Sequence, residues 1–170
     1  QILFVNFFSD SFPALALAFE ESDGLGKKPR KLNKNLFDHE MKFLIMTIGF
    51  STSVFLFLLY YFLLQYGFSG EIVRTFIFAS FATYSLFLIF SVRSLERSIF
   101  TYNPLSNLYL VAGVFIGIFL TALAVYLPFF NDVFGTMPLP PIWVLGVLGV
   151  GFLNILTIEI GKWLFRKRLL

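Results

Sequence analysis

Long apolar runs, separated by short polar stretches, dominate the pattern of this 170-residue chain. A helix needs about 20 mostly apolar residues to cross a bilayer. Five segments reach that length, and the connections between them are short, as in an antiparallel bundle. The pattern therefore predicts an all-α fold, a polytopic membrane helical bundle of five transmembrane helices, with spans at about 1–19, 43–66, 72–92, 108–127 and 142–165.

The amino-acid composition agrees with a membrane protein and excludes several kinds of catalytic and metal site. Hydrophobic residues make up 58% of the chain and charged residues only 14%, whereas soluble domains carry about 25% charge. The sequence has no Cys, which excludes disulfides, thiolate catalysis and Cys-ligated metals. The single histidine, His39, lies in a charged stretch, and we interpret it as a solvated surface residue.

The basic residues predict the orientation of an integral, multi-pass membrane protein. Of the 13 Lys and Arg residues, only Arg74 falls on the side opposite the others. We therefore expect the first connection, the third connection and the C-terminus to be cytoplasmic. This distribution indicates orientation signals and contact with membrane lipid, and no nucleic-acid partner is expected.

The first predicted span carries a carboxylate, Asp10, near its middle. A charged side chain there costs several kcal/mol, so it indicates a functional site. At about 100° per residue, Asn6, Ser9, Asp10 and Pro13 share one face of the helix. Pro13 has no N–H, which leaves the Ser9 carbonyl without its helical partner. These oxygens are ligands for a hard cation; the alternative is that the polar side chains only hydrogen-bond neighbouring helices.

Small residues recur within the fourth and fifth predicted spans. In lipid, small residues let helix backbones approach closely, and polar side chains add hydrogen bonds between helices. We interpret these positions as packing grooves: Gly113, Gly117 and Thr121 in one span, and Gly146, Gly149, Gly151 and Asn154 in the other.

Glu159 is the other carboxylate inside an apolar run. It lies close to the end of the fifth predicted span, and Lys162 follows one turn later. Side chains three apart on a helix are neighbours. The spacing predicts a local ion pair near the membrane interface rather than a transport role.

The segment from Asn6 to Glu20 resembles the sixth transmembrane helix of P-type cation-transporting ATPases, and especially the calcium-pump branch. The family pattern V-N-x-x-T-D-x-x-P-A-x-A-L is matched at Val5-Asn6, Asp10, Pro13-Ala14 and Ala16-Leu17, and Ser9 replaces the usual threonine but keeps a hydroxyl. Later segments, at 93–98, 134–139 and 159–166, are similar to the family's last connections and final helix end. The resemblance covers the whole chain as the sixth to tenth helices.

The resemblance implies that residues 1–170 are the C-terminal transmembrane domain of an ATP-driven pump. The phosphorylation loop, nucleotide pocket and actuator domain of such enzymes precede this region, so the chain itself is expected to hold no catalytic and no ATP-binding or magnesium-binding residue. Its partners would be the remaining helices and the cytoplasmic domains of the parent pump. Gln1 lies inside an apolar run, and we expect it to continue a longer protein.

The resemblance also implies a metal site at Asn6, Ser9 and Asp10, with calcium as the transported ion. Ser85 stands where two-site calcium pumps carry a glutamate, which favours a single site. Calcium takes about 6–8 oxygen ligands, so one helix supplies only a half-site. The alternatives are a proton, sodium or magnesium pump of the same family, or a stand-alone five-helix scaffold without chemistry of its own.

Overall fold

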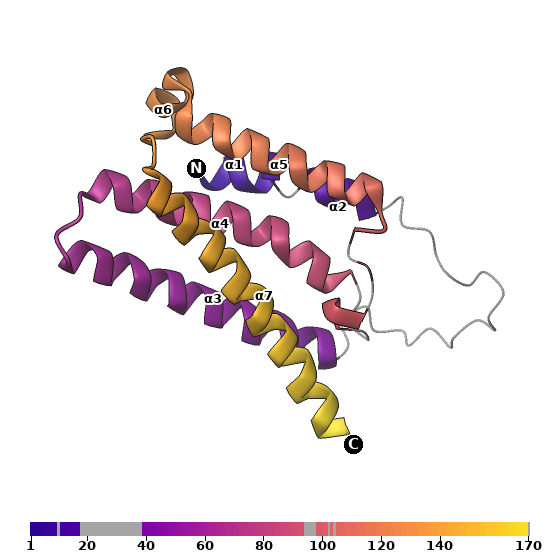
Figure 1. The fold of residues 1–170 in the computed structure, drawn as a ribbon. Coiled ribbons are helices and arrows are strands. Elements are labelled where there is room, and N and C mark those ends of the chain that lie inside the picture. The colour runs from indigo at the N-terminus through magenta and orange to yellow at the C-terminus, as the bar shows by residue number, and fades with distance from the viewer. Residues whose placement is uncertain (10, 18–38, 94–97, 102, 104, 170) are drawn as a thin grey trace.

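The structure is a computed structural model that describes residues 1–9, 11–17, 39–93, 98–101, 103 and 105–169. Every regular element in those ranges is a helix, as Figure 1 shows. In chain order they are α1 (Ile2–Phe4), the π-helix η1 (Val5–Ser9), α2 (Ser11–Leu17), α3 (His39–Gln65), α4 (Gly70–Val92), the 3₁₀-helix η2 (Ile99–Thr101), α5 (Leu108–Tyr126), α6 (Pro128–Phe134) and α7 (Pro141–Leu169).

Within the described ranges, four helices are long and apolar enough to cross a membrane. The four segments are Ile48–Gln65, Gly70–Ser91, Leu108–Tyr126 and Pro141–Leu164. The predicted all-α membrane bundle is confirmed, and these four correspond to the second to fifth predicted spans. The first predicted span differs, because its described residues form three short pieces rather than one continuous helix.

The second and fifth predicted spans are longer helices than the apolar pattern indicated. α3 has 27 residues and α7 has 29, which at 1.5 Å per residue gives lengths of about 40 Å and about 43 Å. A hydrocarbon core is about 30 Å thick. Each helix therefore continues beyond the apolar layer, and α7 carries the basic segment 166–168 within its last turns.

Helix α4 is the centre of the bundle. It packs against α3, α5 and α7, and also against η1 and α2 of the first segment. In Figure 1 it lies between α3 and α5, and α7 crosses it. Ser69 caps its first turn by accepting a hydrogen bond from the backbone N–H of Ile72. Because α4 touches every long helix, its side chains set how closely the others approach.

The glycines of α7 provide that close approach, as the sequence predicted. A Cβ at Gly151 would lie 2.9 Å from Cδ2 of Phe87 and 3.3 Å from Cγ2 of Thr83, and one at Gly146 would lie 3.0 Å from Phe76. A Cβ at Gly149, by contrast, would meet nothing within 4 Å. Two of the three predicted glycines are therefore packing positions, and the third lies on an exposed face.

We expect Gly151→Leu to destabilise the bundle by about 2 kcal/mol or more, because the added side chain overpacks the contact with Phe87 and Thr83. Gly149→Leu is the matched control, since it makes the same chemical change two residues away in open space. Unfolding in detergent micelles, followed by helical circular dichroism, measures both. Equal destabilisation by the two variants would contradict the packing role of Gly151.

A polar contact joins α3 to α7 inside the bundle. The Thr52 hydroxyl donates to Oδ1 of Asn154 at 3.0 Å, and the Asn154 amide donates to the Val150 carbonyl at 2.9 Å. Both side chains are buried. Hydrogen bonds of this kind between membrane helices contribute about 0.6 kcal/mol on average. The contact therefore stabilises the packing of α3 against α7 only modestly.

The connection between α5 and α7 contains a short helix. Its first half is the helix α6, with Pro128 in its first turn and Gly135 as a left-handed cap at φ +60. Proline fits the first turn of a helix because the missing N–H needs no partner there, and glycine fits the left-handed position after the last turn. The short connection expected between the fourth and fifth spans therefore contains a helix of its own.

Candidate functional site

The first segment of the chain, which contains the predicted ion ligands, leaves regular α-helical geometry at those residues. α1 ends at Phe4, and Val5–Ser9 form a π-helix before α2 begins at Ser11. A π-helix closes i→i+5 hydrogen bonds, and such turns often occur at functional sites. The irregular turn directly precedes the turn that contains Pro13, whose ring excludes the normal bond to residue 9.

The three predicted ligand residues are described to different extents. Asn6 lies in the π-helix, and its side chain is exposed. Ser9 ends the same π-helix, where the structure describes its backbone. Asp10 lies outside the described residues. The common arc predicted for these positions assumed regular α-geometry, so the extra residue in the π-turn changes their angular spacing.

Asn6 lies on the side of the first segment that the described helices leave open. Its neighbours Leu3 and Phe7 are 83% and 74% exposed, whereas Phe4 and Val5 are only 7% and 1% exposed. The buried side faces α4 and α5, since η1 packs against both. The polar Asn6 therefore points away from the rest of the described bundle.

Three contacts hold the beginning of this segment in place. The Gln1 amide donates to the Phe134 carbonyl at 2.8 Å. The Phe4 ring makes edge contacts with Phe78 of α4 and Phe134 of α6, with centroid separations of 5.7 Å and 5.0 Å. The helix that carries the candidate ligands is thus attached to α4 and α6 through its first turn.

Ser85, the other residue with a predicted bearing on ion binding, lies in α4. It is half-buried, and its hydroxyl donates to the Ala82 carbonyl of its own helix at 3.0 Å. Among the described residues, no group of three or more His, Asp or Glu side chains is placed to hold a metal ion.

A groove of about 280 Å³ runs beside the first segment, between η1, α3 and α4. Its walls include Val5, Leu56 and Phe78, and its polar lining comes from Gln1, Tyr60 and Arg74. An apolar groove with a guanidinium group is unsuited to a cation. It does not extend the candidate metal site.

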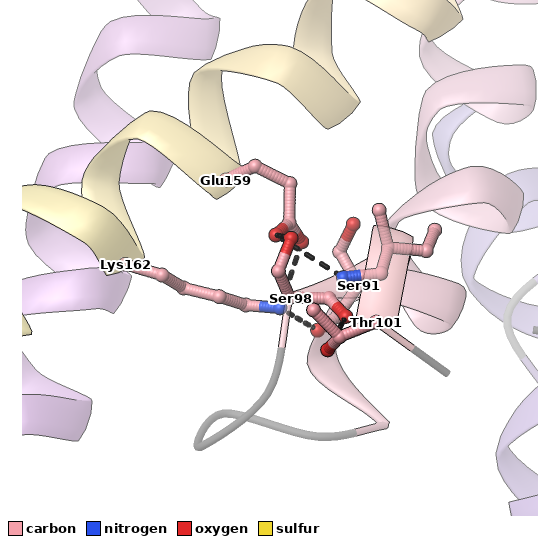
Figure 2. A network of polar contacts seen from close by, with 6 residues as sticks. Ser91, Ser98, Thr101, Glu159 and Lys162 are labelled. Carbon is pink, nitrogen blue, oxygen red and sulfur yellow. Dashed lines mark hydrogen bonds and ion pairs between the residues drawn. The ribbon is translucent and has the colours of Figure 1, made fainter.

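Glu159 and Lys162 form the predicted ion pair, with Oε1 and Nζ separated by 2.8 Å. The pair is more deeply buried than expected at an interface, with 9% and 3% of the two residues exposed. It also reaches beyond α7. Figure 2 shows both side chains directed toward Ser91 and Ser98.

Each charge of this pair meets the helix end of opposite polarity. Lys162 Nζ donates to the Ser91 carbonyl at the last turn of α4. Glu159 Oε2 accepts from the Ser98 hydroxyl at 2.6 Å and from the Ile99 N–H, the first residue of η2, at 3.2 Å. Cations are favoured at helix C-termini and anions at N-termini. The pair therefore connects α7 to α4 and η2, and both of its charged groups take part in contacts that hold the helices together.

Comparison with known proteins assigns this helical bundle to a family. The family model described as "Cation transporting ATPase, C-terminus" matches residues 1–164. The chain belongs to this family. It is the C-terminal membrane region of a P-type cation-transporting ATPase, as the motif around Asn6 and Pro13 predicted.

A relative of this cation-transporting ATPase region is the calcium-transporting ATPase of Bacillus subtilis (strain 168). The two are 31% identical over 174 aligned positions, which include 99% of this chain and 19% of the relative. The chain thus spans about a fifth of the length of the curated relative it matches.

Proposed function

We propose that this chain is the part of an ATP-driven calcium transporter that carries one half of the ion site, at Asn6, Ser9 and Asp10. The observation that carries the proposal is the coincidence of two features. The helix becomes irregular at the segment that holds Asn6 and Ser9, and the same segment contains the polar residues that the family motif shares. A regular apolar helix would give a cation neither free carbonyls nor side-chain oxygens.

The open side of the first segment supports the half-site. Asn6 is exposed between the exposed side chains of Leu3 and Phe7, whereas a complete calcium site surrounds the ion with about 6–8 oxygens. The missing ligands would have to come from other parts of the parent pump. Those parts, with its nucleotide and phosphorylation domains, are the partners we propose.

Calcium is favoured over other cations by the ligand types and by the relative. A carboxylate, an amide oxygen and a hydroxyl suit a hard cation in flexible geometry, and the Bacillus subtilis relative is a calcium-transporting ATPase. A proton pump of the same family is the second candidate, because a single membrane carboxylate also suits proton transfer. Sodium and magnesium differ from calcium in ligand number and geometry.

The test has two measurements. The first is ATP hydrolysis by the complete protein in calcium, sodium, magnesium-only and low-pH media. The second is calcium binding by residues 1–170 alone. We expect micromolar calcium to stimulate hydrolysis by the complete protein and calorimetry to detect no tight binding by the isolated chain. Stimulation by sodium or protons in calcium-free buffer would overturn the choice of calcium. Tight calcium binding by the isolated chain would overturn the half-site.

A further inference from the structure

The helix α6 presents two exposed apolar side chains, Phe129 and Val133, that are 69% and 61% exposed. They are four residues apart and therefore lie on the same face of the helix. The exposed carboxylate of Asp132 lies about 60–100° away around the helix axis, at about 100° per residue. Phe134, about 100–140° around the axis from these two residues, contacts the Phe4 ring of the first segment.

Three hydrogen bonds hold the end of α6 and the residues that follow it against the rest of the bundle. The Thr136 hydroxyl donates to the Ala124 carbonyl of α5 at 2.5 Å. The Met137 N–H donates to the Thr75 hydroxyl of α4 at 3.0 Å. The Phe134 carbonyl accepts from Gln1 at 2.8 Å. The orientation of Phe129 and Val133 is therefore a property of the fold.

The spanning helices place α6 at the edge of the apolar layer. α5 has 19 residues, or about 28 Å at 1.5 Å per residue, which matches a hydrocarbon core of about 30 Å. α6 begins two residues after α5 ends, and in Figure 1 it lies at that end of the bundle. A helix at this depth meets the boundary between acyl chains and headgroups.

Aromatic side chains mark the same depth. Tyr126 ends α5 and is 46% exposed, and Tyr66, which follows α3 at the same end, is 80% exposed. At the opposite end of the bundle, Tyr109 and Trp163 are 66% and 58% exposed. Tyr and Trp gather at both interfaces of a membrane protein, so these two levels bound the apolar layer and α6 follows directly after one of them.

We propose that α6 is an interfacial anchor, with Phe129 and Val133 inserted among the lipids of the phospholipid bilayer and Asp132 in the aqueous headgroup region. Short amphipathic segments bind such an interface by burying their apolar face at the headgroup and acyl boundary. The occupant of this face is the bilayer itself. Through Phe134, the same helix contacts the first turn of the segment that carries the candidate ion ligands.

The test uses single cysteines at 129, 132 and 133, each spin-labelled in the complete protein after any native cysteines outside this chain have been replaced. Residues 1–170 contain none. Collision with oxygen, which concentrates in lipid, is compared with collision with a water-soluble nickel chelate in phosphatidylcholine vesicles. We expect labels at 129 and 133 to favour oxygen several-fold and the label at 132 to favour nickel.

Two results would overturn the anchor. Labels at 129 and 133 that collide with nickel as often as the label at 132 would place the face in water. Labels at 129 and 133 that are immobile and protected from both reagents would show that another part of the protein covers it. Val133→Cys is a small change, so it decides the question alone if Phe129→Cys disturbs folding, which gel filtration of each labelled protein would show.

Discussion

Replacing Asp10 by Asn is expected to abolish cation-stimulated ATP hydrolysis in the complete protein. The variant keeps the size of the side chain and one of its oxygens but removes the negative charge. Calcium sites depend on that charge, because carboxylates replace the hydration shell of the ion. A membrane carboxylate is also costly to retain unless it has a function, so neutralising it should affect transport far more than folding.

The measurement is ATP hydrolysis in membranes as a function of free calcium. We expect hydrolysis by Asp10→Asn to stay at the calcium-free level at every concentration, a loss of at least about 100-fold in calcium sensitivity, which corresponds to about 2.7 kcal/mol. Asp132→Asn is the matched control, since Asp132 is exposed on α6, and it should leave the calcium response unchanged. Normal calcium-dependent turnover by Asp10→Asn would remove Asp10 from the site.

The four long spans could be predicted from the sequence because length and apolarity suffice to identify a membrane helix. Their ends were less accurate. His39, Glu40 and the basic end of α7 are helical but polar, and hydropathy cannot distinguish a helix that continues into the interface from one that stops there. The helix α6 was missed although Pro128 and Gly135 are separated by a length suited to a short helix.

The residues of the candidate site were predicted from their types and spacing, but the local backbone geometry and the packing around them could not be predicted in this way. Pro13 predicts a carbonyl without its helical partner at Ser9, but nothing in the sequence predicts the π-helix at Val5–Ser9, which packs against α4 and α5. The contact of Phe4 with Phe134 joins residues that are 130 positions apart in the chain. Such long-range contacts leave no local pattern in the chain.

For the pair of Glu159 and Lys162, too, the local contact could be predicted from the sequence and the long-range contacts could not. Spacing of three predicted the pair itself, because both partners lie on one helix. Its contacts with Ser91, Ser98 and Ile99 cross to another part of the bundle, and the sequence carried no signal for them. What seemed a local interface pair is a connection among α4, η2 and α7.

Replacing Lys162 by Met is expected to destabilise the bundle by about 3–5 kcal/mol. Removing one partner of a buried ion pair leaves the other charge uncompensated in a medium of low dielectric. Here the Glu159 carboxylate would keep the Ser98 and Ile99 donors but lose its cation. The Ser91 carbonyl would also lose its partner.

A double-mutant cycle in detergent micelles, with SDS as the denaturant and helical circular dichroism as the signal, separates the pair from its surroundings. Glu159→Gln/Lys162→Met should be more stable than the sum of the single variants indicates, by about 1–3 kcal/mol, because the double variant leaves no charge unpaired. Lys42→Met is the control, since Lys42 is an exposed lysine on α3. Additive effects at 159 and 162 would mean that the two side chains act separately. The connection among α4, η2 and α7 would then depend on the separate hydrogen bonds of each side chain with Ser91, Ser98 and Ile99.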